Sequence, residues 1–410
     1  MKKLELPDLP PKFEYRLDLR HHVTPRLLHD EPIHRWFIFP HSFSPQLVDE
    51  ILKAYPLSEG AKMLDSFVGA GTTVLRAKQK GISATGTDLS PLSIFVTQVK
   101  IASYDKTNLF SDLNNLIAFH KPVTIDLTTY PERIRKAFSQ DELAQIEGIK
   151  ANIRLLPTDI SSFFLLALLN VQQKLSRAVP DGGWFRWVEK DNQSHSVVSF
   201  FESRVQLQLA DLPEKPISQP GNWQPILKDA RTLDDLDDTF GALVTSPPYP
   251  NRHDYSRIFH MELLSLGSSE EDVFKFRHSS IRSHVEAHRP DIQANGYKIP
   301  QMLQTAIDSL PESVDSRISP MLKGYFEDMF LCFKAAESRL MPNGTCAFVV
   351  GNVRHAGVMV LVDEILAEVG EQAGLKFDAA WVARLRGNSA QQMAIYGREP
   401  SRETILFFKK

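Results

Sequence analysis

Cysteine is nearly absent, since the 410 residues include only Cys332 and Cys346. Two cysteines cannot form a disulfide framework or a four-ligand zinc site, and their scarcity favours a reducing compartment. Long apolar runs are missing too: the longest, at 163–171, is too short to span a bilayer and predicts a buried helix. No apolar segment follows the lysines of "MKKLELP", so we expect no signal peptide and a cytoplasmic protein.

The chain has little excess charge of either sign. It contains 47 Lys and Arg against 50 Asp and Glu, and its net charge is −3. This balance excludes a uniformly basic coat for nucleic acid, but it allows a local basic groove. With 42% hydrophobic and 24% charged residues, the composition is that of a folded protein, long enough for one large domain with insertions or for two domains.

Two familiar catalytic patterns are also missing. No G-x-S-x-G elbow is present, which argues against a serine hydrolase triad, and no G-K-[ST] is present, which excludes a P-loop. Strand-like segments instead alternate with helical ones along much of the chain. This alternation predicts an α/β fold centred on a parallel sheet.

A glycine turn marks the first candidate site. In "DSFVGAGTT", Gly69 and Gly71 lie between a short strand and a helix that begins near Thr72, and Asp88 ends the next strand in "GTDLSP". Glycine allows close approach of a ligand to the backbone, and a carboxylate at the second strand end can accept the hydroxyls of a ribose. Since the third glycine of a pyrophosphate site is missing, a cofactor with a short charged tail, such as S-adenosylmethionine, fits better than NAD. The alternative is a simple tight turn, with Asp88 capping the Ser90–Pro91 turn.

The second candidate site is "LVTSPPYPNRHDY", residues 243–255. Proline cannot donate to a sheet ladder, so the apolar strand should end here in a stiff loop. The hydroxyl oxygen of Ser246 and the carbonyl of Pro247 can accept N–H groups of an exocyclic amine and so direct its lone pair at a methyl donor. Tyr249 can stack on a base that has been flipped out of a duplex. The alternative is a polar turn with Tyr249 as an ordinary boundary aromatic.

Together these stretches resemble motifs I, II and IV of the S-adenosylmethionine-dependent amino-methyltransferases that act on DNA. Within that family Ser-Pro-Pro-Tyr is typical of N4-cytosine enzymes, whereas Asp-Pro-Pro-Tyr and Asn-Pro-Pro-Tyr predominate among N6-adenine enzymes. "ILKDAR" (226–231) resembles motif III, and "WFIFPHSFSPQLVDEIL" (36–52) resembles motif X. The resemblance implies a class I (Rossmann-like) methyltransferase: a mainly parallel seven-stranded sheet with one antiparallel strand, plus helical insertions.

The resemblance also assigns roles to individual residues. The catalytic residues it implies are Ser246, Pro247, Pro248 and Tyr249. The cofactor contacts it implies, with Asp229 and Ala230 beside the adenine, are Pro40, His41, Ser42, Asp65, Phe67, Gly69, Gly71, Thr72, Asp88, Leu89, Asp229 and Ala230. As candidates for nucleic-acid contact at the pocket rim and beside it we name Arg252, Tyr255, Arg277, Arg282 and Arg354. No metal site is expected, because the histidines lack cysteines or paired acids at ligand spacing.

The motifs divide the chain into six parts. They are an N-terminal arm (1–35), a cofactor-binding part of the core (36–104), a mostly helical insertion and candidate for target recognition (105–212), a core part with motifs III and IV (213–264), a second insertion as a candidate for DNA contact (265–322) and the C-terminal part of the core (323–410). The order departs from many N4-cytosine enzymes, which place the catalytic motif before the cofactor motif. The expected partners are double-stranded DNA, at which the protein would be nucleoid-associated, and a cognate restriction endonuclease of a bacterial restriction-modification or defence system.

Several alternatives stay open at this point. N6-adenine methylation and methylation of RNA bases share the same amine-holding geometry, and a non-catalytic nucleic-acid-binding protein is a more distant possibility. Methylation at C5 of cytosine needs a cysteine nucleophile, usually after a proline, and neither Cys332 nor Cys346 follows one.

Overall fold

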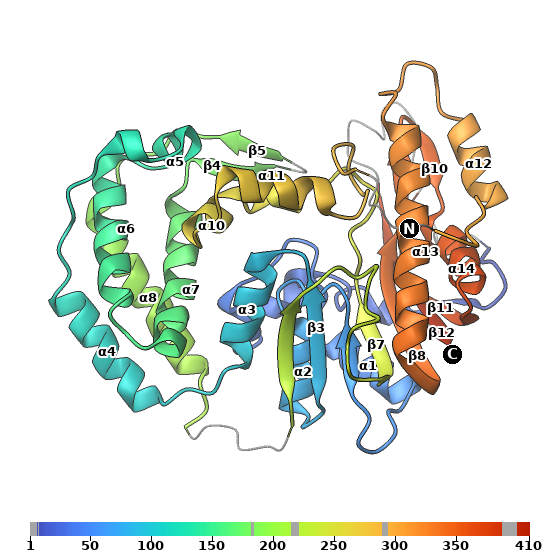
Figure 1. Cartoon of the computed structure of the whole chain (residues 1–410), viewed down its shortest axis with the longest axis horizontal. Coiled ribbons are helices and arrows are strands. Elements are labelled where there is room, and N and C mark those ends of the chain that lie inside the picture. Colours follow the sequence, from blue (N-terminus) through green and yellow to red (C-terminus); the bar gives the residue numbers. More distant parts are fainter. Residues whose placement is uncertain (1–5, 7, 182–183, 215–220, 289–293, 388–399) are drawn as a thin grey trace, which may run out of the picture.

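An eight-stranded sheet forms the centre of the molecule, with the strand order β1-β11-β12-β8-β7-β2-β3-β6 (Figure 1). The computed structural model describes residues 6, 8–181, 184–214, 221–288, 294–387 and 400–410. In chain order the strands of this sheet are β1 (Phe13–Tyr15), β2 (Met63–Asp65), β3 (Ala84–Asp88), β6 (Trp223–Leu227), β7 (Phe240–Thr245), β8 (Leu340–Gly351), β11 (Lys376–Arg386) and β12 (Ser401–Lys409). Helices lie between most consecutive strands, so the predicted α/β fold is confirmed.

The strand β12 is antiparallel to both of its neighbours, and every other pairing in the sheet is parallel. The predicted mainly parallel sheet with one antiparallel strand is therefore confirmed. The sheet has one strand more than the seven expected, because the N-terminal arm adds β1 at the edge, where Phe13 pairs with Ala380 of β11. Three residues are too few to show the alternation of apolar and polar side chains that marks a strand in a sequence.

Helices cover both faces of the sheet. Those on one face are α1 (Pro45–Ala54) and α2 (Thr72–Gln79), and those on the other are α13 (Ile318–Arg339) and α14 (Val362–Gln372). Ile405 and Phe407 of β12 belong to the core cluster with α1 and α2. Leu406 and Phe408 belong to the cluster with α13 and α14. Successive side chains thus reach opposite faces, as the period of two in a strand requires.

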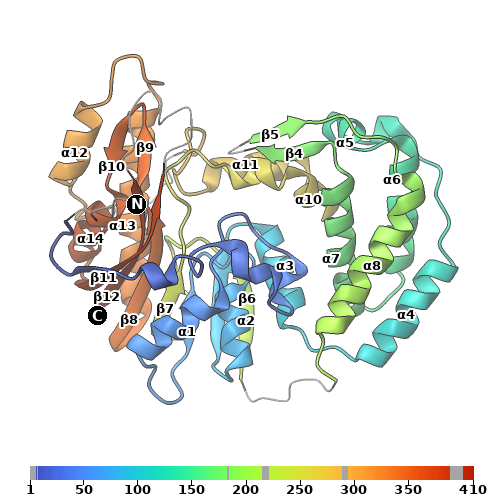
Figure 2. The same cartoon turned by 180° about the vertical axis from the view of Figure 1, so that it is seen from behind.

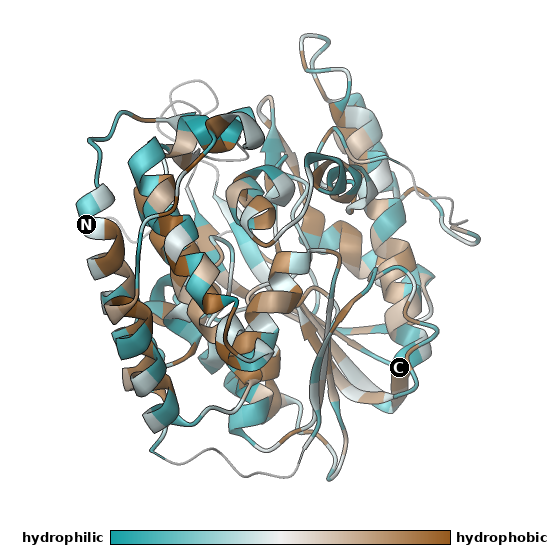
Figure 3. Cartoon of the chain, turned by 60° about the vertical axis from the view of Figure 1, so that its left-hand side comes forward, coloured by the Kyte–Doolittle hydropathy of each residue, from teal (hydrophilic) through white to brown (hydrophobic). Residues whose placement is uncertain are grey.

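A helical lobe stands beside the sheet, and α3 (Pro91–Ile101) lies between them in both views (Figures 1 and 2). The lobe consists of α4 (Lys106–Ala118), α5 (Glu132–Ala137), α6 (Gln140–Ile153), α7 (Thr158–Leu175), α8 (Val197–Asp211) and a hairpin of β4 (Ala178–Asp181) and β5 (Trp184–Trp187). Figure 3 shows apolar and polar residues alternating around these helices. The run at 163–171, predicted as a buried helix, lies within α7, where Phe163, Phe164 and Leu168 are fully buried.

The segment after β7 reaches from the sheet to the lobe. Its helices are α9 (Tyr255–Ile258), α10 (His260–Ser265), α11 (Glu270–Ser279) and α12 (Gln301–Asp308). In Figure 1, α10 and α11 lie above α3 and extend between the lobe and the part of the molecule with α13, and α10 packs against α7 of the lobe. The remaining elements are a hairpin of β9 (Val353–His355) and β10 (Val358–Val360) and the short 3-10 helices η1 (Leu17–Leu19), η2 (Pro25–His29), η3 (His34–Trp36), η4 (Leu127–Thr129) and η5 (Ser194–Ser196).

Parallel pairing brings the ends of three strands together. β2 lies between β3 and β7, so that Leu64 pairs with Thr85 on one side and with Leu243 on the other. The carboxyl ends of these strands therefore meet at one edge of the sheet, which is where open α/β sheets bind ligands.

Candidate functional site

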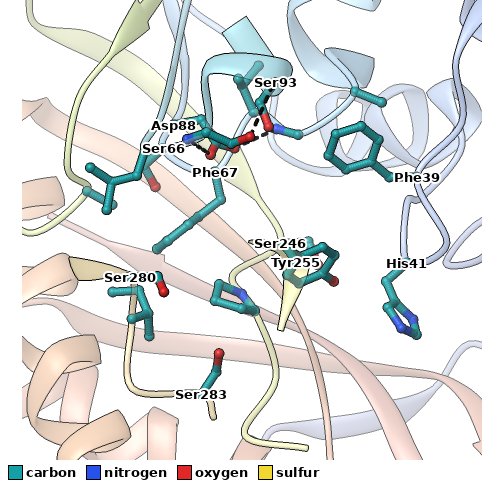
Figure 4. Close-up of a pocket in the computed structure, with 18 of the residues that line it drawn as sticks. Phe39, His41, Ser66, Phe67, Asp88, Ser93, Ser246, Tyr255, Ser280 and Ser283 are labelled. Atoms are coloured by element: carbon teal, nitrogen blue, oxygen red, sulfur yellow. Dashed lines mark hydrogen bonds between the residues drawn. The ribbon is translucent and has the colours of Figure 1, made fainter. Parts of the chain in front are cut away.

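A cavity with about 1060 Å³ of empty space, part of it open to solvent, lies at this edge of the sheet. It has two sides. The sheet side is formed by residues at or just after the ends of β2, β3 and β6, which include Asp65, Asp88 and Asp229. The insertion side is formed by the segment after α11, which includes Ser280, Ser283 and His284. Figure 4 shows Asp88 on one side and Ser280 and Ser283 on the other, with Ser246 and Tyr255 between them.

Asp65, the last residue of β2, links two strand ends. Its Oδ1 accepts hydrogen bonds from the hydroxyl of Thr245 (2.7 Å) and from the backbone N–H of Phe67 (3.1 Å). Burial of the carboxyl, which is 2% exposed, raises the pKa of Asp65 to about 6. Because Thr245 immediately precedes Ser246, Asp65 connects the glycine turn to the Ser-Pro-Pro-Tyr loop.

The glycine turn has a backbone that other residues rarely adopt. Gly69 and Gly71 have φ of +48° and +82°. A Cβ on Gly71 would lie 2.8 Å from Oγ1 of Thr97, so a side chain is excluded there by both conformation and space. The N–H of Gly69 donates to Oδ2 of Asp88 (3.0 Å), which ties the turn to the end of β3.

Asp88 lines the cavity with a carboxylate that is already held in place. Its Oδ1 accepts the N–H of Ser90 (2.9 Å), so it also caps the Ser90–Pro91 turn, as the simpler alternative required. Burial raises the pKa of Asp88 above its ordinary value. Each carboxylate oxygen accepts more than one hydrogen bond, so capping leaves acceptor capacity toward the cavity.

Lys228, Asp229 and Ala230, which follow β6, complete the sheet side. The carboxylate of Asp229 forms an ion pair with Arg231 (2.7 Å). The Arg231 guanidinium is 1% exposed and also lies 3.3 Å from Asp328 of α13. Asp229 is therefore anchored through a buried charge network that joins the sheet side of the cavity to α13.

In the Ser-Pro-Pro-Tyr loop, Ser246 and Pro248 line the cavity, whereas Pro247 and Tyr249 are not among its lining residues. The hydroxyl of Ser246 donates to the backbone carbonyl of Val349 in β8 (3.1 Å). This bond uses the only proton of the hydroxyl and leaves its oxygen as a hydrogen-bond acceptor.

Tyr249 is 7% exposed and packs against β8. A Cβ on Gly351 would come within 2.8 Å of the Tyr249 ring, so glycine is needed beside it. The tyrosine that lines the cavity is Tyr255, which was predicted only as a rim residue. Its ring lies 6.3 Å from that of His41 and 6.4 Å from that of Phe259.

Most of the predicted cofactor contacts are brought together. Those that line the cavity are His41, Ser42, Asp65, Phe67, Gly69, Thr72, Asp88, Leu89, Asp229 and Ala230. Pro40 is exposed and does not line the cavity, and neither does Gly71, which lies against Thr97. The predicted cofactor contacts at the ends of β2, β3 and β6 thus line the same cavity.

The predicted nucleic-acid contacts are scattered. Arg252 follows the Ser-Pro-Pro-Tyr loop with a positive φ of 70°, and its side chain is 46% exposed and pairs with Asp315 (3.3 Å). Arg354 lies in β9 and donates to the carbonyl of Gly357 (3.1 Å).

Two of the predicted nucleic-acid contacts, Arg277 and Arg282, form ion pairs with carboxylates within the chain. Arg277 pairs with Asp254 (2.9 Å), and its side chain is 12% exposed. Arg282 is buried and binds Asp328 (2.7 Å) and Glu327 (3.0 Å) of α13. Both guanidinium groups are thus paired with carboxylates of the chain, and phosphate contact at these two positions stays a prediction.

Several lining residues were missed by sequence reasoning, among them His253 and the three residues that define the insertion side. The rings of His41 and His253 lie 4.6 Å apart. Burial lowers the pKa of His41 to about 4 and also lowers the pKa of His253 and of His284, which favours the neutral form of each ring. The signals available were weak: His253 lies four residues after Tyr249, and "RHSSIRSH" (277–284) mixes arginine and histidine with serine around one apolar residue.

Within the described ranges, no three or more His, Cys, Asp or Glu side chains are grouped so as to hold a metal ion. In the same part of the chain, no helix has the length and apolar character needed to cross a membrane.

No family model matches the chain, but individual proteins do. It is 26% identical to the Type II methyltransferase M.BsoBI of Geobacillus stearothermophilus, over 93% of this chain and 86% of that protein. It is also 26% identical to the Type II methyltransferase M.AvaI of Nostoc sp., over 93% of this chain and 87% of that protein. The Type II methyltransferase M.MvaI of Kocuria varians is 24% identical over 53% of each chain. Among solved structures, TrmN from Thermus thermophilus matches with a TM-score of 0.31 and 10% identity, over 89% of this chain and 48% of that one.

Proposed function

We propose that this chain is a Type II DNA methyltransferase that transfers a methyl group from S-adenosylmethionine to the N4 amine of a cytosine flipped out of double-stranded DNA. A bacterial restriction-modification or defence system is the expected setting, with a cognate restriction endonuclease as partner. The similarity to Type II methyltransferases over 93% of the chain supports the reaction class. The observation that carries the proposal is that Asp88 and Ser246, one from each candidate motif, line a single cavity.

The sheet side of the cavity fits S-adenosylmethionine. Asp88 has acceptor capacity for ribose hydroxyls, and Gly69 provides a turn without a side chain next to it. The aromatic rings of Phe39 and Phe67 supply apolar surface to the same cavity. When bound, the cofactor supplies a methyl group on a sulfonium, whose leaving group is already activated.

The chain then has to orient the amine. Ser246, whose proton is used by Val349, presents an acceptor oxygen to one N–H of the amine, and we assign the carbonyl of Pro247 to the other. Accepting both N–H groups would direct the nitrogen lone pair toward the methyl group. Since the two prolines stiffen the loop, this orientation costs little reorganisation.

Serine at this position favours cytosine N4 over adenine N6, because Ser-Pro-Pro-Tyr is the version typical of N4-cytosine enzymes. Adenine N6 and RNA bases remain the second candidates, since they present the same amine. A non-catalytic binding protein has no need for both motifs in one cavity.

The test is mass spectrometry of nucleosides after incubation of the protein with double-stranded DNA and isotopically labelled S-adenosylmethionine. We expect label in N4-methylcytosine. Label in N6-methyladenine would overturn the choice of base, and label only in a parallel RNA reaction would overturn the choice of nucleic acid. Cofactor binding without transfer to either polymer would contradict the enzymatic assignment.

A further inference from the structure

A strained turn precedes the cavity wall formed by Phe39, His41 and Ser42. Ile33 has φ of +66° and ψ of −45°, and the N–H of His34 donates to the carbonyl of Pro32 (2.8 Å). These values describe a γ-turn of the rare, strained kind, and a β-branched residue makes it less favourable still. Such a conformation persists only where the surroundings hold it.

Asp211, the last residue of α8 in the helical lobe, holds this turn. Its side chain is 2% exposed. Its carboxylate accepts the backbone N–H of Ile33 (3.0 Å), the guanidinium of Arg35 (3.0 Å from Nε) and the indole N–H of Trp36 (3.0 Å). One buried carboxylate thus accepts hydrogen bonds from Ile33, Arg35 and Trp36, which precede Asp211 in the chain by 175 to 178 residues.

Two more side chains of the lobe bind the carbonyls of the same segment. Arg204 of α8 donates to the carbonyls of Arg35 (2.8 Å) and Trp36 (2.7 Å). Asn170 of α7 donates to the carbonyl of Trp36 (2.9 Å). Trp36 itself is fully buried. Its ring and that of Phe163 in α7 pack edge to face, with 5.4 Å between their centroids.

The other end of the segment is tied to the glycine turn. Lys100 of α3 donates to the carbonyls of Phe37 (2.7 Å) and Ala70 (2.8 Å). Its ammonium is buried, so the bond to Ala70 between Gly69 and Gly71 is shielded from water. Phe39, two residues after Phe37, would lie 3.7 Å from a Cβ on Gly69.

We propose that Asp211 and Arg204 are positioning residues for the cofactor cavity. By holding the strained turn, the helical lobe sets where the wall of Phe39, His41 and Ser42 stands relative to the glycine turn. The lobe is thus part of the cofactor site as well as a candidate for target recognition. This inference rests on the proposed function, because the cavity is taken to bind S-adenosylmethionine.

The test is a calorimetric titration of S-adenosylmethionine into the full chain and into Asp211→Asn, with Glu214→Gln as the matched control. Glu214 is in the same lobe and pairs with Lys106 (2.7 Å), but its side chain is 88% exposed. Loss of hydrogen bonds from a charged acceptor should weaken cofactor binding by about tenfold in Asp211→Asn and leave the control unchanged. At saturating cofactor, kcat should stay within about twofold while KM for the cofactor rises, because no group that touches the reacting atoms has changed.

The outcomes separate this inference from the proposed function. If the parent chain binds no S-adenosylmethionine, both fall together. If the parent binds and Asp211→Asn binds equally well, only the positioning role is overturned. If Asp211→Asn does not fold, as judged by its unfolding transition, Arg204→Met replaces it. Methionine keeps an unbranched apolar side chain but cannot donate to the carbonyls of Arg35 and Trp36, so weaker binding would support the proposal and unchanged binding would refute it.

Discussion

The two sides of the cavity are held in place by different means. On the sheet side, Asp65 and Asp88 accept backbone N–H groups from residues that follow them closely, Phe67 and Ser90. On the insertion side, the segment from Ser279 to His284 is held by long-range contacts.

These contacts come from three arginines. Arg231 donates to the carbonyl of Ser279 (2.6 Å), Arg252 donates its N–H to the carbonyl of Ser283 (3.1 Å), and Arg282 pairs with Asp328 (2.7 Å). Asp65 and Asp88 are therefore held in part by turns at their own strand ends, together with the long-range bond from Thr245 to Asp65. The insertion-side segment is tied to distant parts of the chain through Arg231, the backbone N–H of Arg252 and Arg282. Changes on the sheet side should affect cofactor binding, whereas changes at the loop between the two sides should affect transfer.

The largest effect is expected for Ser246→Ala, which should lower kcat by about 100-fold or more because an acceptor for the amine is lost. Cofactor affinity should not change, since Ser246 is not on the sheet side. Ser309→Ala is the matched control, because its hydroxyl also donates to a backbone carbonyl (2.7 Å) but Ser309 is exposed directly after α12. Single-turnover kinetics and a cofactor titration measure the two quantities, and an equal loss in both would erase the distinction between transfer and binding.

Next in size is Gly71→Ala, compared with Gly60→Ala. Both glycines have positive φ, but a Cβ on Gly71 meets Thr97 at 2.8 Å and one on Gly60 meets nothing within 4 Å. The shared backbone cost is about 1–2 kcal/mol, and overpacking should add about 1–3 kcal/mol at Gly71 alone. Denaturant unfolding gives the difference in free energy of unfolding between the two variants. Equal values would show that the backbone around Gly71 adjusts to the added Cβ without loss of stability.

The pH dependence of stability tests Asp65. Its pKa is raised to about 6 in the folded chain, above the ordinary value of 3.8, so the folded state binds more protons between these values. Stability should therefore fall as pH rises from about 4 to about 6, by up to about 3 kcal/mol for this group. Asp65→Asn should remove this contribution, because an amide does not ionise while its oxygen still accepts from Thr245. The measurement is the free energy of unfolding of both proteins as a function of pH. The same dependence on pH in both would contradict the raised pKa of Asp65.

The smallest effect is expected for Arg252→Ala. The arginine is exposed beside the Ser-Pro-Pro-Tyr loop, so loss of one phosphate contact should weaken DNA binding severalfold. The slope of the logarithm of the binding constant against the logarithm of the salt concentration should become shallower by about one. Lys409→Ala is the control, because Lys409 is also an exposed partner of an acid, Asp378 (3.0 Å), but lies at the opposite edge of the sheet. Equal binding by both variants would remove Arg252 from the candidate interface.

Local patterns were enough to predict much of the sheet side. Glycines between a strand and a helix, and an aspartate at the end of the next strand, define positions relative to residues only a few places away. Parallel pairing then brings Asp65 and Asp88 to the same edge of the sheet. Ser246 was predictable for the same reason, since two prolines stop its strand.

Long-range contacts were not predictable in this way. A basic segment containing Arg277 and Arg282 has the same composition whether it faces phosphate or a buried carboxylate, and only the positions of Asp254 and Asp328 decide between them. Likewise, Tyr249 and Tyr255 are both plausible cavity residues in the sequence, and Gly351 of β8 determines where Tyr249 packs.

By itself, then, the sequence determined the α/β class and the positions of the glycine turn and the Ser-Pro-Pro-Tyr loop at strand ends, because each depends on backbone conformation within a short stretch. Only the tertiary structure decided the eighth strand β1, the insertion side of the cavity and the hold of Asp211 on Ile33. These features join residues far apart in the chain, and the free energy that fixes them comes from burying charges and rings against partners that no local pattern identifies.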